Sequence, residues 1–451
     1  MSLLSASLIT ACFTFAGSKK ISLAQVTKDI TYLASDDLKG RGNFSAEISQ
    51  AANYIAKRFK ENGLVAADAI SAQGFLQKYQ VTKIRPKELS LTLNGQVINS
   101  ENLAMASTVA NFSWLITENA QANNTDNKFK VHSVSKDDDM QAFINKLNKQ
   151  GGQHLVLLNP AHETLFKPYQ NYFKRGVTKL KQDNTDKVKG GVIVIVLTAT
   201  TAKQIKSLQV SGVSTISNNE LTNVVAVLPG KSKPDEIVLY SAHYDHLGMK
   251  NAEGDNIYNG ADDNASGTTA IINIAQYYAK QGHNARTLLF AAFSAEELGG
   301  FGSQYFSKQL DPKTITAMIN IEMIGKPSKF GAGSLWMTGM ERSTLGEQLN
   351  NVLAKDGKKI HQDPYPEQGL FYRSDNATLA RLGVPAHSFI STQLDKDKHY
   401  HQVSDDINSL NLSSLHKVIE ALAIATQPLV DGSITPSRID VNLVKKKGLI
   451  Y

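Results

Sequence analysis

Three segments between residues 236 and 294 decide the fold: EIVLYSAH (236–243), SGTTAIINIAQYYAKQ (266–281) and TLLFAAFS (287–294). The first and third are short, continuous apolar runs, which is typical of strands buried on both faces of a sheet. The second has apolar residues at helical spacing and predicts an amphipathic helix. A strand, a helix and a second such strand form the repeating unit of a parallel sheet covered by helices.

The same alternation continues on both sides of this stretch. Residues 22–65 are predicted to be helical, with an interruption at Gly40-Arg41-Gly42. The pattern predicts an α/β fold with a mostly parallel central sheet flanked by helices. Further strands are predicted at 223–230, 316–324, 333–339 and 385–392, and further helices at 302–310 and 413–430.

Between residues 80 and 220 the character of the sequence changes. Short β-like runs such as GGVIVIVL alternate with polar stretches rich in Asn and Lys. We interpret residues 83–220 as an inserted mixed α+β domain, residues 21–82 and 221–431 as the main domain, and residues 432–451 as a C-terminal tail. The insertion has no cluster of metal-ligating residues, so its histidines are predicted to be surface or packing residues: His132, His154 and His162.

The composition is that of a globular protein without a nucleic-acid interface. The net charge is +7, but the lysines are dispersed, apart from the run Lys445-Lys446-Lys447. A nucleic-acid interface would need a concentrated basic patch with interleaved aromatic residues. Cys12 is the only cysteine, so no intrachain disulfide can form and stability must come from packing.

The first residues predict export. Residues 2–16 are apolar and small, too few to span a bilayer but suited to the core of a secretory signal, although the usual charged flank is missing. We interpret residues 1–20 as a signal peptide or a lipoprotein signal. The segment ITAC, ending at Cys12, resembles a bacterial lipobox, and cleavage after Ala16 is the alternative. The protein is expected to be periplasmic, secreted, or held at the outer membrane by a lipid on Cys12.

Acids and histidines stand where the predicted strands end. His243 closes one strand, Glu296 and Glu297 follow the next, and Glu322 lies near the end of a third. Ligands of α/β sheets bind beyond the carboxyl ends of the strands, so these side chains are expected to converge. Imidazoles and carboxylates nearly without thiols suit zinc before other divalent metals. Such a site makes a nucleophile from water at neutral pH, so the sequence predicts a metallohydrolase.

Local patterns predict how single residues point. In SAHYDHLG, period-two alternation puts His243 and Asp245 on one side and His246 elsewhere, so Asp245 is expected to orient the imidazole and His246 is left out of the site. In GADDNASG, Asp262 and Asp263 precede a helix. One acid suffices for a helix cap, so the second indicates a further role, such as bridging two metals.

The remaining acids also favour a bound cation. Glu296 and Glu297 repel each other unless a cation is nearby or one is protonated, which favours one ligand and one general base. Glu322 is the single acid of an apolar run, and a buried acid without a partner is costly. His401, beside Tyr400 in a polar loop, is informative only together with the others.

Together these segments resemble a family of co-catalytic zinc exopeptidases, the one that holds bacterial secreted aminopeptidases and glutamate carboxypeptidase II. The order of motifs matches, from HYDHLG through GADDNASG, EELGGFGS and NIEMIG to YHQVSDD. The opening YLASDDLKGRG…AANYIAKRFKENGL is also similar to how many members begin. The resemblance covers residues 22–80 and 221–430. The insertion sits where some members carry a protease-associated domain, without a firm sequence signature of one.

The resemblance implies two zinc ions per chain. His243 and Glu322 would hold one, Glu297 and His401 would hold the other, and Asp262 would bridge them.

It also implies roles for four neighbouring residues. Glu296 would be the general base and acid, taking a proton from a metal-bridging water and passing it to the leaving amine. Asp245 would support His243, Asp263 would support the bridging carboxylate, and Tyr400 would hydrogen-bond the tetrahedral oxyanion.

Two positions depart from the family pattern. The family more often has Asp where this chain has Glu322, and many relatives have SDH where this chain has RSDN at residues 373–376. Neither change removes a ligand or the base, so activity is expected.

The expected reaction is hydrolysis of the N-terminal peptide bond of peptides. The free α-amine of the substrate would lie beside the metals and acids, which restricts cleavage to the chain end. The side-chain pocket is expected to involve Trp336, Phe371, Tyr372 and Arg373, and an ordinary place in the core is the alternative for the three aromatic residues.

Three other functions stay open at this point. A glutaminyl cyclase would keep the fold but use one zinc. A binding protein with a degenerate site would keep the metal shell, against which the intact Glu296 argues. A carboxypeptidase acting on acidic dipeptides would need a cationic pocket for a terminal carboxylate, and Arg373 is the residue that offers one. The oligomeric state is not fixed by the sequence.

Overall fold

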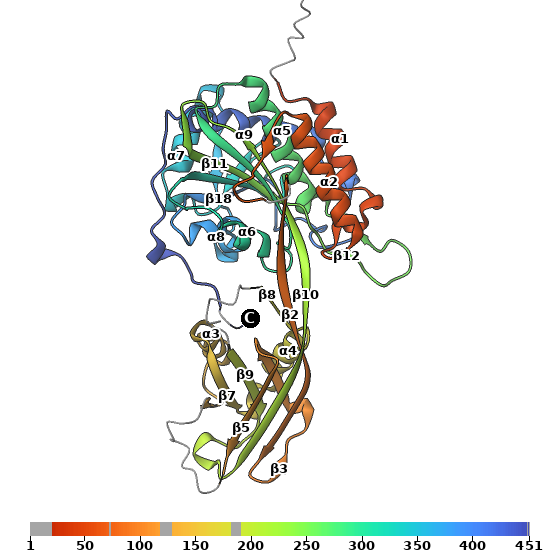
Figure 1. Ribbon diagram of the computed structural model, residues 1–451, viewed down its shortest axis with the longest axis vertical. Helices are drawn as coiled ribbons and strands as arrows, with labels where there is room; N and C mark the ends of the chain where they lie inside the picture. The colour runs from red at the N-terminus through yellow and green to blue at the C-terminus, as the bar shows by residue number, and fades with distance from the viewer. Residues whose placement is uncertain (1–19, 72–73, 118–128, 182–190, 449, 451) are drawn as a thin grey trace, which may run out of the picture.

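The structure is a computed structural model that describes residues 20–71, 74–117, 129–181, 191–448 and 450. It has two lobes, one above the other in Figure 1. The upper lobe, called the sheet lobe, contains the chain before β2 (Leu76–Leu93) and, apart from the C-terminal end at Ile450, the chain after β10 (Leu208–Leu228). The lower one, called the inserted lobe, contains the chain between them. These two long strands are antiparallel partners and run from one lobe into the other.

The centre of the sheet lobe is a parallel sheet with the strand order β14, β11, β15, β18. Antiparallel strands continue it on both sides, because β10 pairs with β14 and β16 pairs with β18. The predicted α/β fold with helices around a central sheet is confirmed, and its parallel part is concentrated at the centre. The strands of this lobe are β1 (Val65–Ala66), β11 (Lys233–His243), β14 (Arg286–Phe293), β15 (Ile315–Ile321), β16 (Leu335–Met337), β17 (Ile360–Gln362) and β18 (Ala386–Ile390), with the separate hairpin β12 (Gly248–Met249) and β13 (Ile257–Tyr258).

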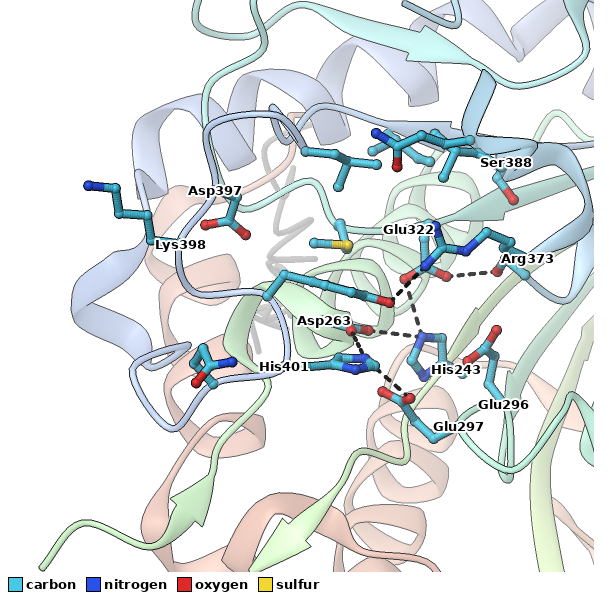
Figure 2. Close-up of a pocket in the computed structure, with 18 residues that line it drawn as sticks. His243, Asp263, Glu296, Glu297, Glu322, Arg373, Ser388, Asp397, Lys398 and His401 are labelled. Atoms are coloured by element: carbon cyan, nitrogen blue, oxygen red, sulfur yellow. Dashed lines mark hydrogen bonds and ion pairs between the residues drawn. The ribbon is translucent and has the colours of Figure 1, made fainter. Parts of the chain in front are cut away.

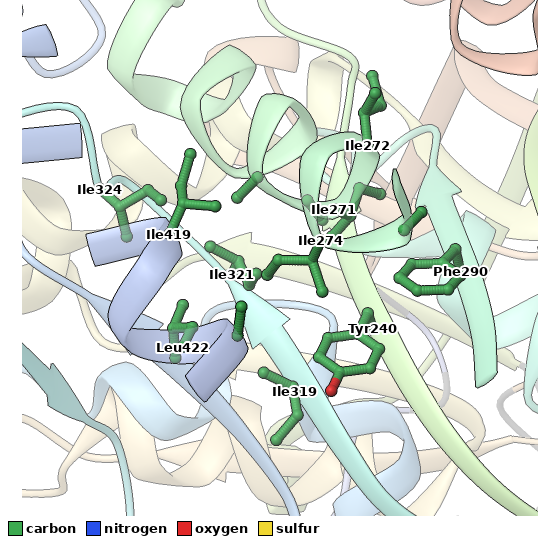
Figure 3. Close-up of a cluster of buried hydrophobic side chains, with 14 of the residues drawn as sticks. Tyr240, Ile271, Ile272, Ile274, Phe290, Ile319, Ile321, Ile324, Ile419 and Leu422 are labelled. Carbon is green, nitrogen blue, oxygen red and sulfur yellow. The ribbon is translucent and has the colours of Figure 1, made fainter. Parts of the chain in front are cut away.

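Helices cover both faces of this sheet, and the four central strands contribute side chains to the core on each face. Tyr240 and Phe290 point into one core, whereas the neighbouring Leu239 and Leu289 point into the other. This explains the continuous apolar runs, and Figure 3 shows the first core, where Tyr240 and Phe290 lie under the isoleucines of α5. The first core is covered by α1 (Leu23–Leu33), α2 (Ala46–Glu61), α5 (Gly267–Gln281), α7 (Leu345–Leu353), α9 (Leu412–Ala425) and α10 (Gln427–Val430), and the second by α6 (Phe301–Phe306) and α8 (Asn376–Ala380).

The predicted helical stretch 22–65 is two helices with a break between them. The hydroxyls of Ser22 and Ser45 cap α1 and α2 by accepting hydrogen bonds from backbone N–H groups of the first turns. A 3-10 turn, Asp36–Arg41, separates the helices and ends on residues with positive φ. The chain therefore turns sharply at Gly40-Arg41-Gly42 and passes beside β12 and β13.

The inserted lobe has a mixed four-stranded sheet in the order β4, β9, β7, β6. Ile193 and Ile195 of β9 face the helices of this lobe, and Val192 and Val194 face the ribbon of β2, β5 and β10. The elements of this lobe are β3 (Gln96–Val97), β4 (Leu103–Ser107), β5 (Asn111–Ile116), β6 (Lys130–Val134), α3 (Met140–Gln150), β7 (Gly152–Leu158), α4 (Glu163–Lys174), β8 (Val177–Leu180) and β9 (Gly191–Leu197).

The expected domain boundaries fall inside strands that both lobes share. The boundaries expected at residues 83 and 220 fall inside β2 and β10, so the two lobes share a continuous ribbon. The segment expected to be a tail is built into the structure: Ile439 and Val444 are buried in the sheet lobe, and Ile450 is buried in the core of the inserted lobe. The backbone N–H of Ile450 donates to Asn148 Oδ1 at 2.8 Å.

Residues 1–19 of the segment predicted to be a signal, Cys12 among them, lie outside the described residues. Among the helices that the structure describes, none combines the length and apolarity needed to cross a bilayer.

Candidate metal centre

The acids and histidines of the strand ends meet at one edge of the sheet. His243 is the last residue of β11, Glu322 follows β15 directly, and Glu296 lies three residues beyond β14. Because these strands are adjacent and parallel, their carboxyl ends lie side by side. Figure 2 shows the resulting cluster, with Asp263 and His401 arriving from loops outside the sheet.

The first half of the cluster consists of His243, Asp263 and Glu322. His243 Nε2 lies 3.2 Å from Glu322 Oε1 and 3.3 Å from Asp263 Oδ1. His243 Nδ1 lies 3.1 Å from the backbone oxygen of Asp245, to which it can donate, and this leaves the Nε2 lone pair facing the acids. The three ligand atoms are close enough to hold one metal ion.

The second half shares the carboxylate of Asp263. His401 Nε2 lies 3.2 Å from Asp263 Oδ2 and 3.3 Å from Glu297 Oε2. Glu297 Oε1 lies 2.8 Å from Nδ1 of His246. The two oxygens of Asp263 thus face different imidazoles, which is the arrangement of a carboxylate that bridges two metals.

Asp262, expected to be the bridge, lies outside the cluster, so that assignment is wrong in position. Its carboxylate accepts hydrogen bonds from the Gly325 N–H at 2.7 Å and from Thr392 Oγ1 at 2.6 Å. Successive side chains point apart here because the backbone at Asp263 is extended (φ −105°, ψ 94°). Asp263 therefore takes the bridging position, and Asp262 ties the loop to its surroundings.

His246 contacts the cluster, although the sequence placed it elsewhere. The period-two argument fails because β11 ends at His243, so the alternation stops before His246. The only feature of the sequence that pointed to His246 was its position three residues after His243. Its Nδ1 bonds Glu297, and its Nε2 is buried with no hydrogen-bond partner among the described residues.

Asp245 holds the two glutamates in place through their backbone. It accepts hydrogen bonds from the N–H groups of Glu296 at 3.1 Å and Glu297 at 3.2 Å, and from Asn43 Nδ2 at 2.7 Å. Its Oδ1 lies 3.7 Å from His243 Nδ1. Asp245 thus lies beside the imidazole of His243, as expected. Most of its hydrogen bonds, however, come from the loop that carries Glu296 and Glu297.

Lys326 is a further residue that the sequence did not single out. Its Nζ lies 3.0 Å from Asp397, 3.4 Å from Asp405 and 3.5 Å from Asp262. Asp405 accepts in turn from the backbone N–H groups of Asp262 and Asp263. Because Asp397 and Asp405 flank His401 in sequence, this cation connects the His401 loop to the Asp262-Asp263 segment.

Glu296 lies beside the cluster and faces the cavity (Figure 2). Among the described residues, none donates a hydrogen bond to its carboxylate. Burial raises the pKa of Glu296 well above its usual range, and the nearby Asp375, Glu322 and Glu297 raise it further. Burial also raises the pKa of Asp375, to about 7. A carboxyl group with such a preference for its proton suits a residue that accepts and returns one.

A cavity of about 350 Å³ opens beside the cluster. Its apolar wall includes Met323, Leu370, Ile390 and Leu394. Arg373 lines it as expected, but the three aromatic residues do not: Trp336 is buried behind the wall, and Phe371 and Tyr372 pack in the second core. These three aromatic residues therefore belong to the hydrophobic core, which is the alternative that the sequence left open for them. Tertiary packing decides which side of each segment faces the cavity.

Tyr400 closes the cavity over His401. Its ring stacks on the imidazole with centroids 4.0 Å apart, and its hydroxyl accepts from Arg373 Nη2 at 3.3 Å. Burial raises the pKa of Tyr400, so the phenol keeps its proton at neutral pH. The hydroxyl is a hydrogen-bond donor at the edge of the metal cluster.

The cluster fits a pair of divalent metals. Its acids create a negative field: Glu322 and Glu296 hold the pKa of His243 well above its usual range against burial, and Asp263 with Glu297 raises that of His401 to about 10. Without a cation these buried carboxylates would repel one another. Imidazole nitrogens and carboxylate oxygens in triads suit zinc.

Comparison with known proteins agrees with this geometry. Residues 223–426 match the model of peptidase family M28. A probable leucine aminopeptidase from Arthroderma otae is 32% identical over 202 residues, which are 43% of this chain and 53% of that protein. Leucine aminopeptidase 1 from Ajellomyces dermatitidis is 30% identical over 203 residues, 43% of this chain and 52% of its own length. The chain thus spans about half the length of the curated relatives it matches.

Solved structures resemble the chain over nearly its whole length. An aminopeptidase from Aneurinibacillus sp. strain AM-1 aligns with a TM-score of 0.52 at 17% identity, covering 95% of this chain and 97% of that one. A zinc aminopeptidase from Bacillus subtilis aligns with a TM-score of 0.53 at 17% identity, covering 95% and 100%. At this identity the likeness shows the fold. The match to the model of peptidase family M28 covers residues 223–426, which hold every member of both halves of the cluster.

Proposed function

We propose that this protein is a zinc-dependent aminopeptidase that binds two zinc ions and hydrolyses the N-terminal peptide bond of peptides. The observation that carries the proposal is the carboxylate of Asp263, whose two oxygens face two separate imidazoles beside the free carboxyl group of Glu296. The family match and the names of the relatives, leucine aminopeptidases and zinc aminopeptidases, support it.

The residues of the two halves would hold the metals. His243 and Glu322 would hold one zinc, Glu297 and His401 the other, and Asp263 would bridge them. Zinc bound there polarises a carbonyl group and lowers the pKa of water to about 7. The inner imidazole of His246 fixes the carboxylate of Glu297.

The protein's own groups would move the proton and stabilise charge. Glu296 would take a proton from the attacking water and give it to the leaving amine, a role that its raised pKa and its free carboxylate support. Tyr400 and Arg373 place an O–H and a guanidinium at the mouth of the site, where they would donate to the developing oxyanion.

The shape of the cavity favours a substrate that ends there. The acids line one side, and would hold the protonated α-amine of an unblocked peptide. The apolar wall of Met323, Leu370, Ile390 and Leu394 would contact the first side chain. A blocked N-terminus lacks the charge that the acids attract, so N-acetylated peptides are expected to be poor substrates.

A carboxypeptidase acting on acidic dipeptides is the second function that an observation favours. Arg373 lines the cavity, and no carboxylate lies within ion-pair distance of its guanidinium in the described part of the chain. A free guanidinium is a site for a substrate carboxylate. The glutaminyl cyclase alternative uses one zinc, and the shared Asp263 between two triads favours two.

We also propose that the protein is exported, on the apolar segment 2–16 that precedes its polar sequence. The insertion occupies the place of a protease-associated domain in some relatives. It would take no direct part in the reaction, because none of its described residues lines the cavity.

A substrate panel tests the proposed activity. Pairs of peptides, free and N-acetylated, are incubated with the zinc-loaded protein, and the released amino acids are identified; N-acetylated acidic dipeptides are included. Release of the first residue from free peptides only is the expected result. Release from the acetylated acidic dipeptides instead would make the protein a carboxypeptidase. The Glu296→Gln variant, purified in parallel, controls for contaminating peptidases.

A further inference from the structure

The break between α1 and α2 holds an arginine that is completely buried. Arg41 has 0% of its surface exposed, and in the described structure no carboxylate lies within ion-pair distance of it. A buried guanidinium normally pairs with an acid, because taking the charge out of water is costly. Arg41 lies between two glycines, and its hydrogen-bond partners are close in sequence to members of the metal cluster. Its burial therefore needs an explanation other than an ion pair.

The guanidinium of Arg41 donates hydrogen bonds to four backbone carbonyl groups. Nε donates to Tyr244 at 2.8 Å, Nη1 donates to Asn259 at 2.6 Å and to Leu33, and Nη2 donates to Gly260 at 2.8 Å. Tyr244 follows the ligand His243, and Gly260 precedes Asp263 by three residues. One rigid, planar fork thus connects the loop that carries His243 to the loop that carries Asp263, two of the three members of the first half of the cluster.

The third loop is connected by the next polar residue. Asn43 Nδ2 donates to Asp245 at 2.7 Å, and Asn43 Oδ1 accepts from the N–H of Ala295 at 3.1 Å, directly before Glu296. The backbone oxygen of Arg41 also accepts from the N–H of His246 at 3.2 Å. Residues 41–43 therefore contact the loops that carry His243, Asp263 and Glu296.

The glycines on either side allow this close approach. A Cβ atom on Gly40 would lie 2.3 Å from the carbonyl oxygen of Tyr258, and one on Gly42 would lie 2.9 Å from Cα of Gly248. Both are far shorter than any non-bonded contact allows. The sequence Gly-Arg-Gly is thus the one that brings a guanidinium to this place with the backbone against the β12–β13 hairpin.

We propose that Arg41, assisted by Asn43, is a positioning residue that fixes the spacing of His243, Asp263 and Glu296 and thereby sets the zinc affinity and the turnover of the site. The inference rests on the proposed function, since it concerns the same metal pair. The acids Asp245, Asp263 and Glu297 keep the guanidinium charged, although burial lowers its pKa to about 10. The charge lies behind the ligands and contacts none of their side chains.

The chain offers a matched control in Arg286. It too is 0% exposed and donates to the carbonyl groups of Leu429 and Ile434. Unlike Arg41 it also pairs with an acid, Glu236, at 2.6 Å, and it lies at the start of β14, the end of the sheet away from the metals. Arg286→Lys and Arg41→Lys remove the same fork, keep the charge, and are both expected to lower the thermal stability of the metal-free protein.

Zinc affinity separates the two variants. It is measured on folded protein by competition with a zinc chelator, together with kcat and KM on a free peptide. Arg41→Lys is expected to lose about 10–100-fold in zinc affinity and to lose kcat with KM nearly unchanged, because a flexible ammonium cannot hold four carbonyl groups in one plane. Arg286→Lys is expected to keep the wild-type affinity and kcat.

Two results would overturn the inference. One is an Arg41→Lys variant with wild-type zinc affinity and kcat, and the other is an equal loss of affinity in Arg286→Lys. If Arg41→Lys does not fold, Asn43→Ala carries the test: a smaller loss of affinity and kcat supports the inference and wild-type values overturn it. Absence of zinc binding in the wild type would instead remove the proposed function, so the two failures are distinguishable.

Discussion

The two lobes use similar elements but differ in what they bury. Both have a sheet with apolar cores on its two faces. In the sheet lobe, buried charges gather at the strand ends, among them Asp245, Asp263, Glu322 and Lys326. In the described part of the inserted lobe, by contrast, no Asp, Glu, Lys or Arg is buried. Because burying a charge is costly, its concentration in one lobe marks the lobe that holds the chemistry.

Two buried histidines of the inserted lobe bond its own backbone. Rings and amides bond carbonyl oxygens: His154 contacts Gly151 at 2.8 Å, and His162 contacts Ser135 at 2.7 Å. These histidines are packing residues, as expected from the sequence. A polar residue thus indicates a functional site only where it meets others of complementary chemistry, and the following variants test that contrast between the lobes.

The largest effect is expected from Glu296→Gln. The amide cannot accept and return a proton, so kcat should fall by about 10²–10⁴-fold, while zinc content and fold are retained. Steady-state kinetics and metal analysis by atomic emission measure both. Glu163→Gln, at the exposed start of α4 in the inserted lobe, is the control and should leave kcat unchanged. A Glu296→Gln variant with the wild-type rate would remove this residue as the base.

The adjacent pair Asp262 and Asp263 gives the next effect. Asp263→Asn replaces the carboxylate whose two oxygens serve as metal ligands in both halves of the cluster, so the zinc content should fall below two per chain. Asp262→Asn, whose carboxyl group bonds Gly325 and Thr392, should keep both zinc ions and lose stability instead. Metal analysis after dialysis distinguishes the two, and the reverse order would restore Asp262 as the bridge.

Core truncations should separate stability from catalysis. Ile195→Ala in β9 and Ile319→Ala in β15 each remove a fully buried side chain, and each should cost about 2–5 kcal/mol of unfolding free energy. Urea denaturation measures that cost. Only Ile319→Ala, three residues before Glu322, should change kcat/KM for a small peptide. A comparable change in Ile195→Ala would mean that the inserted lobe takes part in catalysis.

Acid should destabilise both lobes through one histidine in each, and the effect should be smaller in the inserted lobe. Burial lowers the pKa of His387 in the sheet lobe and of His132 in the inserted lobe from 6.5 to about 4. The unfolded chain then binds more protons, so this stability is complete above pH 6.5 and is lost as the pH falls towards 4.

For the fully buried His387 the loss is about 3 kcal/mol, and it is smaller for the half-buried His132. Unfolding curves recorded between pH 7 and pH 4 should show a shallower pH dependence in His387→Gln than in the wild type. An unchanged slope would show that this imidazole titrates normally in the folded protein.

Much of the fold could be read from the sequence, because burial on both sheet faces leaves continuous apolar strands. The argument from strand ends also placed His243, Glu297 and Glu322 at one edge, where the structure has them. It failed where regular backbone stops. Asp262 and Asp263 lie on an irregular turn, where no periodicity tells which carboxylate points inward.

Tertiary packing decided the rest. Trp336, Phe371 and Tyr372 stand near the expected pocket in sequence, but the cavity wall is formed by other faces of these segments. In the sequence, Arg41 was recognisable only as part of the interruption of a helical pattern, because the four carbonyl groups that it binds come from other segments of the chain. Such contacts have no signature in one sequence.

The most direct test of the metal pair is anomalous X-ray diffraction at the zinc edge from crystals of the zinc-loaded protein. Two peaks are expected, one on each side of the Asp263 carboxylate: the first beside His243 and Glu322, the second beside Glu297 and His401. A single peak, or a pair of peaks bridged by Asp262, would contradict the proposed metal pair.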